Sequence, residues 1–316
     1  MSSKRIQSKI AAVLLVASFL TAGGPALSNT VSATAAKQES ASTQSLFAWA
    51  KEDAGLLKAA KQGAVKVQNQ KVTKDGITLK LTDYLYDGAR VSFALQREGN
   101  DLEATLDDLV NSDKKGVLLY SEVYVNGKKQ EQSSYGRLSM KDGNSLVISF
   151  NDQSSKGPRT VFLPNQFELM VKAYVSGVKD PFTFKVPVKK QAAQNTVLNK
   201  AVVKKTGNLS YTVKRVELTP YSSRLEIIAQ GSHKLVKDLK YLRFDIADNK
   251  GTIRTPLLQT WDGVVKNQRY FDMTYASFAA APSSVVVKPY SLETDGKRAP
   301  KKVYLQDSEL TLSIKK

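Results

Sequence analysis

Two stretches of this chain are copies of one segment, and together they decide the fold. Residues 67–96 read VQNQKVTKDGITLKLTDYLYDGARVSFALQ, and residues 197–230 read VLNKAVVKKTGNLSYTVKRVELTPYSSRLEIIAQ. Each copy has the form strand, glycine turn, strand, turn, strand. The copies lie about 130 residues apart, whereas the repeats of a solenoid recur roughly every 20–50 residues. The repeat therefore predicts two similar domains in tandem.

The alignment of the two copies rests on a small set of residue pairs. Three pairs align without gaps and three more need small gaps: Val67 with Val197, Asn69 with Asn199, Val72 with Val202, Gly76 with Gly207, Arg90 with Arg224 and Gln96 with Gln230.

The rest of the chain after Val65 also has the pattern of β-strands. Residues 77–82 alternate between apolar and polar side chains, which is typical of a strand with one buried face. Asn126-Gly127 and Asp142-Gly143 predict hairpins, since these residue types tolerate the positive φ of tight turns. Many short strands separated by turns favour Greek-key sandwiches of immunoglobulin type.

We therefore predict a mainly β fold built from two tandem immunoglobulin-like β-sandwich domains. The first domain is expected at residues 46–191 and the second at residues 196–316. The polar stretch from Lys189 to Thr196 is the predicted junction, and its shortness allows only limited relative motion of the domains.

One amphipathic helix is predicted before the first sandwich. Ser45 can cap it, apolar side chains recur at helical spacing from Leu46 to Lys61, and Gly63 is a natural stop. We expect this helix to pack on the first sheet; contact with a membrane is the alternative. A shorter helix is expected within the insertion at residues 97–116, over Asp101–Val110, with its leucines on one side.

The N-terminus has the order of a secretory signal peptide. Lys4, Arg5 and Lys9 precede an apolar stretch from Ile10 to Ala22, which is shorter than the roughly 20 residues that cross a membrane. Cleavage is expected near Ala35 or Ala36, which makes residues 1–36 the signal peptide and 37–45 a linker. The alternative is a retained N-terminal anchor. The chain has no cysteine, which excludes disulfides and cysteine-ligated metals.

The chain is strongly basic, with 47 Lys and Arg against 29 Asp and Glu. A basic exported protein meets anionic polymers such as those of the cell wall, whereas the expected address disfavours nucleic acid. The predicted contact residues are two adjacent pairs, Lys204 with Lys205 and Lys301 with Lys302. Two adjacent lysines are not both buried, so reversing these pairs to Glu is expected to weaken binding and leave the fold intact. The alternative is that the charge only keeps the protein soluble.

No motif in the sequence indicates an enzyme, a cofactor or a metal site. His233 is the only histidine and is expected on a surface loop. Three Ser-x-x-Lys pairs lack the helical setting of that catalytic motif: Ser112/Lys115, Ser176/Lys179 and Ser313/Lys316. The acidic residues of the insertion do not match a calcium loop, so we interpret them as a solvated face: Asp101, Glu103, Asp107, Asp108 and Asp113.

An aromatic cluster in the second domain is a candidate carbohydrate platform, but core packing is the favoured interpretation. Its members are Trp261, Tyr270, Phe271 and Tyr275, with Lys266 and Arg269 nearby.

Three segments resemble a family of uncharacterised exported domains from spore-forming Gram-positive bacteria. The first runs from Phe47 to Thr78 and contains Gly55-Leu56, Val67-x-Asn69-x-x-Val72 and Asp75-Gly76. The second runs from Leu163-Pro164 to Val188, and the third from Asn199-Lys200 to Thr219-Pro220. In that family the pair of domains usually lies outside a single transmembrane helix, often in proteins that resemble membrane-bound anti-sigma factors. The resemblance implies a second immunoglobulin-like domain and supplies no catalytic residues.

Two functions remain open at this stage. The first is a non-enzymatic exported protein of the cell envelope with a binding or structural role, whose partner is an anionic wall polymer or an envelope protein. The second is a sensory or regulatory ectodomain that acts with a membrane-bound partner of anti-sigma type.

Overall fold

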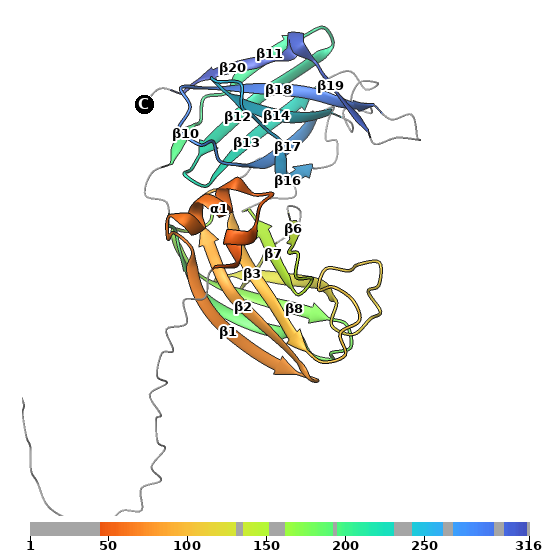
Figure 1. The fold of residues 1–316 in the computed structure, drawn as a ribbon. Coiled ribbons are helices and arrows are strands. Elements are labelled where there is room, and N and C mark those ends of the chain that lie inside the picture. Colours follow the sequence, from red (N-terminus) through yellow and green to blue (C-terminus); the bar gives the residue numbers. More distant parts are fainter. Residues whose placement is uncertain are drawn as a thin grey trace, which may run out of the picture. The chain divides into compact units, whose positions relative to one another are not determined.

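The fold is described from a computed structural model (Figure 1). The structure describes residues 45–130, 135–151, 162–191, 195–230, 242–261, 268–293 and 300–314. Residues 43–316 form one compact unit. The predicted signal peptide and His233 lie outside the described residues. Within the described residues, no helix is long and apolar enough to cross a membrane.

Two antiparallel sheets share the first hydrophobic core. Sheet A has the order β1-β2-β3-β7-β6 and sheet B the order β5-β4-β8-β9. Their strands are β1 (Lys66–Lys74), β2 (Ile77–Tyr86), β3 (Val91–Gly99), β4 (Leu118–Val125), β5 (Lys128–Lys129), β6 (Tyr135–Ser139), β7 (Ser145–Phe150), β8 (Gln166–Val175) and β9 (Phe182–Lys189). Inward side chains from both sheets, such as Phe93 and Phe184, form one buried cluster.

A second pair of sheets encloses a separate core in the same way. Sheet C has the order β10-β12-β13-β17-β16, with β11 also paired to β12, and sheet D has the order β15-β14-β18-β19, with β20 also paired to β18. Their strands are β10 (Thr196–Leu198), β11 (Val202–Thr206), β12 (Leu209–Leu218), β13 (Ser222–Gln230), β14 (Leu242–Asp248), β15 (Ile253–Arg254), β16 (Pro256–Trp261), β17 (Gln268–Ala276), β18 (Ser284–Glu293), β19 (Lys301–Tyr304) and β20 (Leu310–Ser313). The short 3₁₀ helix η3 (Gln306–Ser308) joins β19 to β20.

The mainly β fold predicted from the sequence is confirmed, and the two pairs of sheets are consistent with immunoglobulin-like sandwiches. Residues 45–191 are called the first half below and residues 195–314 the second half. The hairpin predicted at Asn126-Gly127 is present between β4 and β5, and both residues have the expected positive φ (48° and 76°).

The predicted N-terminal helix is divided in two. A 3₁₀ turn, η1 (Leu46–Trp49), is capped by the Ser45 hydroxyl, which accepts from the Phe47 N–H at 3.2 Å. The α-helix α1 (Ala54–Lys61) starts later because Asp53 caps it. The expectation of one helix from Leu46 was wrong, since Asp53 supplies a second cap inside the apolar stripe.

The helix packs on the outer face of sheet A, as predicted. Leu56 and Ala59 of α1 join a third buried cluster with Leu85 of β2 and Val147 of β7. Tyr221 of the second half completes this cluster, which therefore contains residues of both halves.

The predicted helix over Asp101–Val110 does not form. Arg97 donates to the carbonyl of Gly116 at 2.7 Å and to that of Ala104 at 2.8 Å, which fixes the insertion as a series of turns. Leu106 is buried in the first core, whereas Leu109 is 54% exposed. The leucines therefore do not share one buried side.

The internal repeat is present in the structure, but its alignment differs from the one read from the sequence. The turn Asp87–Arg90 joins β2 to β3, and the turn Thr219–Ser222 joins β12 to β13; in each, the first N–H donates to the fourth carbonyl. A β-bulge lies at the same distance before each turn, between Leu81 and Asp83 in β2 and between Val213 and Arg215 in β12. The two copies match here without gaps, so the structure pairs Arg90 with Ser222 and Arg224 with Ser92.

Candidate functional site

The four lysines predicted to contact an anionic polymer lie on two strands of different sheets. Lys204 and Lys205 are neighbours on β11 of sheet C, and Lys301 and Lys302 are neighbours on β19 of sheet D. Successive side chains of a strand point to opposite faces. Lys205 and Lys301 are exposed, and their neighbours are half-buried. The four lysines therefore do not form one continuous row.

Lys302 has a structural partner. Its Nζ lies 2.9 Å from Asp245 Oδ2 and 2.9 Å from the Thr255 hydroxyl, and the Tyr304 hydroxyl donates to the same Asp245 oxygen at 2.6 Å. The Asp245 side chain is 0% exposed. A buried carboxylate needs such partners, so reversing Lys302 to Glu would leave it beside a second negative charge. For Lys302 we therefore now expect reversal to Glu to destabilise the fold.

The other residues considered from the sequence have local or structural roles. Phe271 and Tyr275 lie in the second core, as predicted; the side chain of Trp261 is outside the described residues. In the insertion, Glu103 pairs with Lys114 at 3.0 Å and Asp107 with Arg137 at 2.6 Å.

The described residues offer no metal or nucleophile site of the types considered. No group of three or more His, Cys, Asp or Glu side chains among them could hold a metal ion. Ser112 and Ser176 lie in turns and Ser313 on β20, so none of these serines opens a helix.

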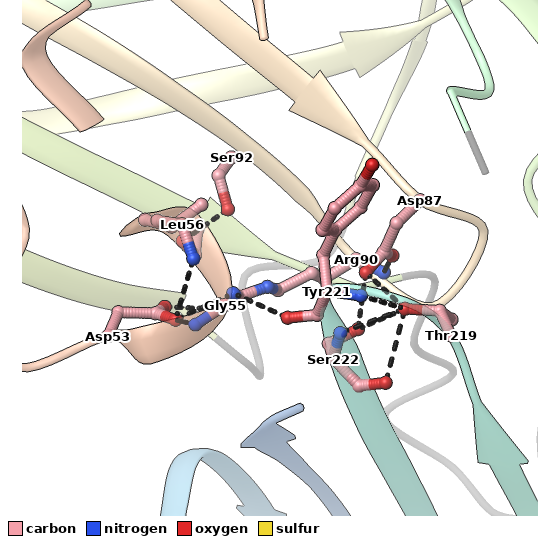
Figure 2. Close-up of polar contacts among 10 residues, drawn as sticks. Asp53, Gly55, Leu56, Asp87, Arg90, Ser92, Thr219, Tyr221 and Ser222 are labelled. Carbon is pink, nitrogen blue, oxygen red and sulfur yellow. Dashed lines mark hydrogen bonds and ion pairs between the residues drawn. The ribbon is translucent and has the colours of Figure 1, made fainter. Parts of the chain in front are cut away.

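A buried polar network joins the two halves (Figure 2). Asp87 Oδ1 caps its own turn by accepting from the N–H groups of Ala89 and Arg90 at 2.9 and 3.0 Å. Asp87 Oδ2 accepts from the hydroxyls of Thr219 and Ser222 at 2.7 and 2.5 Å. The equivalent turns of the two repeats are thus hydrogen-bonded to each other.

Thr219 serves both turns at once. Its hydroxyl oxygen accepts from the N–H groups of Tyr221 and Ser222 at 3.0 and 2.8 Å while the hydroxyl donates to Asp87. Thr219 therefore caps the second turn as Asp87 caps the first. Thr219 and Ser222 are buried, and Asp87 is 0% exposed, so this carboxylate depends on donors from the other half.

Arg90 links the helix to the second half. Its side chain is 1% exposed and forms a bidentate ion pair with Asp53, the N-cap of α1. Burial, the largest single effect, lowers the pKa of Arg90, but the Asp53 charge, the hydrogen bonds to Asp53 and the Asp87 charge together raise it by more, so the net direction is upward and the guanidinium stays charged. The Arg90 Nη2 atom, which donates to Asp53 Oδ1, also lies 3.5 Å from the carbonyl oxygen of Tyr221.

Arg224 makes the reciprocal contact from the second half. It forms a bidentate pair with Asp272 on β17, with Nε 2.7 Å from Oδ1, and its Nη1 donates to the carbonyl of Ala89 at 3.3 Å. Ala89 and Tyr221 are the third residues of the two equivalent turns. Each half therefore directs a buried, ion-paired arginine to the same carbonyl position of its counterpart.

The sequence pointed to the two arginines of this network but did not show which residues they contact. Arg90 and Arg224 were paired in the alignment, and the structural alignment shifts that pairing by two residues. Arg90 is the residue before β3 and Arg224 is the third residue of β13, and both side chains reach the turn of the other half. A charged residue inside an apolar strand pattern is a sign of a buried pair, but its partner cannot be read from the strand itself.

A second feature that sequence reasoning missed is the outer face of sheet B. Tyr120, Glu122 and Tyr124 alternate on β4 and point away from the core. Across the strand pair, Tyr120 lies opposite Tyr174 and Glu122 opposite Lys172. We call these five residues, together with Lys129 and Lys185, the tyrosine face.

The rings of the tyrosine face are held in fixed positions. Tyr120 and Tyr174 are stacked, with ring centroids 4.3 Å apart. Glu122 accepts from the hydroxyls of Tyr124 and Tyr174 at 2.9 and 3.2 Å and forms an ion pair with Lys129. The hydrogen bond from Lys129, followed by that from Tyr124, lowers the pKa of Glu122, so this carboxylate is ionised at neutral pH.

Comparison with known families gives two matches, one at each end of the chain. Residues 194–314 match a family of unknown function, DUF5643. Residues 1–99 match a domain of unknown function, DUF4179. Each match covers less than half of the chain, and both families are uncharacterised. No curated protein matches the chain.

Comparison with solved structures supports the fold alone. The crystal structure of a conserved domain protein from Bacillus anthracis has a TM-score of 0.54 and 11% identity, over 78% of this chain and 88% of that one. Bovine butyrophilin (TM-score 0.19, 8% identity, 74% of this chain and 95% of that one) and a marsupial T cell receptor (TM-score 0.20, 7% identity, 79% and 100%) also match. The TM-scores of these last two structures are too low to support a structural argument.

Proposed function

We propose that this chain is a non-enzymatic protein of the cell envelope that binds anionic wall polymer through a basic surface on two interlocked sandwiches. The observation that carries the proposal is how the charged side chains are distributed. Asp53, Asp87, Arg90 and Arg224 are buried and held in the contact between the halves, where they support structure rather than chemistry.

The lysines at the surface are left for a partner. Within the described part of the chain, no ion pair joins Lys204, Lys205 or Lys301 to a carboxylate, while Lys80, Lys288 and other lysines are paired. With 47 basic and 29 acidic residues the chain carries a net charge of +18, which attracts polyanions over about one Debye length of roughly 8–10 Å.

Export supports the envelope as the place of action and rests on the order of basic, apolar and small residues at the N-terminus. The resemblance to exported domains of Gram-positive spore formers points the same way. The two matched families add no activity of their own, because both are of unknown function.

Retention on purified cell walls over a range of salt concentrations tests the proposal. Binding should be strong at low salt and should fall steeply above physiological ionic strength, because exposed charges are screened. Walls stripped of their anionic polymer should retain much less protein. Equal retention on stripped and intact walls would overturn the proposal.

The regulatory ectodomain is the second candidate, favoured by one observation on the first half. Trp49 is 58% exposed and, with Leu46 and Met140, lines a groove of about 480 Å³. An exposed aromatic beside apolar side chains is typical of a protein contact. A membrane-bound partner of anti-sigma type would bind there with little salt dependence, and Trp49→Ala would weaken that contact without changing retention on walls.

A further inference from the structure

We infer that the tyrosine face is the surface that recognises the polymer, and that its ligand is a linear chain of sugar rings joined by phosphodiesters. This inference rests on the proposed function and assigns its site. Three features support it: the rings, the lysines beside them and the contrast with the lysines of the second half.

The rings supply apolar area at the surface. Tyr120 is 49% exposed and stacks on Tyr174, so the pair presents an aromatic surface to solvent. A carboxylate of the same face, Glu122, fixes the hydroxyls of Tyr124 and Tyr174. The rings are thus oriented before any ligand arrives, which lowers the entropy cost of binding. Sugars place C–H groups on aromatic faces, and ordered rings suit them.

The lysines lie next to the rings in the strand register. Met170 of β8 is opposite Tyr124 on one side and Lys185 of β9 on the other. Lys129 of β5 is opposite Tyr124. A row across the sheet therefore has a lysine at each end and apolar side chains between them.

Strands β8 and β9 carry lysines on this outer face, and their positive charge suits a phosphodiester. Lys172 lies beside Glu122, with its Nζ 5.3 Å from the centre of the Tyr124 ring. Lys185 and Lys189 both point outward on β9 and are about 13 Å apart along the strand. None of these three lysines pairs with a carboxylate among the described residues. Alternating apolar and cationic positions fit a polymer that alternates rings and phosphates.

The second half lacks this combination at its predicted contact lysines. Lys204 lies opposite Tyr211 in the strand register, but Tyr211 is 1% exposed and belongs to the core. Val203, the exposed apolar neighbour on β11, has no ring. Lys204 and Lys205 therefore supply charge without a surface for a sugar, and they are a matched control for Lys172 and Lys185.

Binding of the full chain to two polymers tests the inference. The probes are a hexosamine-phosphate polymer of defined length and inorganic polyphosphate with the same number of charges. Tyr120→Ala/Tyr174→Ala should weaken binding to the sugar polymer about tenfold and to polyphosphate less than about twofold. Lys172→Glu/Lys185→Glu should weaken both by about tenfold or more. Lys204→Glu/Lys205→Glu has the same change in charge but lies away from exposed rings, so it should weaken both only through lost general attraction, by about threefold.

Thermal unfolding of each variant shows that the fold is retained. If the alanine variant is destabilised, Tyr120→Leu/Tyr174→Leu keeps apolar bulk, removes the aromatic faces and should show the same selective loss. Equal losses for the two lysine variants, or no loss for the tyrosine variants, would overturn the inference and leave the proposed function standing. Binding of the parent chain to neither polymer would overturn both.

Discussion

Gly55 of helix α1 lies directly against the carbonyl group of Tyr221 in the second half. A Cβ atom at position 55 would be 1.8 Å from that oxygen and 2.9 Å from its carbon. Backbone atoms cannot move aside as the end of a side chain can. Position 55 therefore accepts only glycine, and the reason lies in a residue far away in the sequence.

The variant Gly55→Ala should reverse the usual effect of this substitution. Alanine in a helix normally stabilises by about 1 kcal/mol relative to glycine. Here the clash with Tyr221 should instead destabilise the chain by about 1–3 kcal/mol. Urea unfolding measures the difference, and an increase in stability would show that the helix does not contact the second half.

Removal of the Arg90 charge should be costly because Asp53 would stay buried without its cation. We expect Arg90→Met to lower the free energy of unfolding by about 3–5 kcal/mol. Asp53→Asn added to this variant should cost less than it does in the parent chain, since the two residues form a pair. Purely additive losses in a double-mutant cycle would argue against the ion pair.

The Thr219 hydroxyl is predicted to stabilise the second turn and its contact with Asp87. Thr219→Val keeps the shape but removes one of the two hydroxyls that donate to Asp87 Oδ2 and leaves the N–H groups of Tyr221 and Ser222 without their acceptor, at a cost of about 1–3 kcal/mol. Thr219→Ser keeps the hydroxyl and should unfold within about 0.5–1 kcal/mol of the parent. Similar melting temperatures for the valine and serine variants would contradict this role.

Alkaline pH should destabilise the second half through its buried tyrosines. Burial, followed by the nearby Asp245 charge, raises the pKa of Tyr290 from 10.0 to about 12. The folded-state pKa lies above the unfolded one, so the stabilisation is complete below pH 10 and is lost as the pH rises towards 12. Unfolding and tyrosinate absorbance, followed together over this range, should rise in one step. Early titration of all tyrosines without unfolding would rule out the buried environment.

The independence of the second half remains a prediction from the sequence. Residues 196–316 enclose a core of their own and should unfold in a single transition with a β-type circular dichroism spectrum. Without the first half, Tyr221 and Arg224 lose partners, so the fragment should be less stable than the whole chain. A disordered fragment would mean that the shared contact is required for folding.

The β class, the internal repeat and several turns follow from the amino-acid sequence alone. These features depend on residues that are near one another along the chain: alternating side chains place one face of β2 in the core, and Asn126-Gly127 adopts positive φ wherever it occurs in a tight hairpin. The charge excess is likewise a property of composition alone. The prediction of one long N-terminal helix was wrong because Asp53 caps a separate helix within the apolar stripe.

How the two copies contact each other, and which surface is available to a partner, depend on the tertiary fold. Asp87 and Thr219 are ordinary turn residues by sequence, and they bond to each other because folding brings two equivalent turns together. Tyr120 and Tyr174 stack because β4 and β8 are neighbours in sheet B, although the residues are far apart in the chain. Lys302 is not free to bind a partner as the exposed lysines are, because it forms an ion pair with Asp245 on another strand. Contacts of this kind depend on strand order and register, and a pattern of single residues does not encode either.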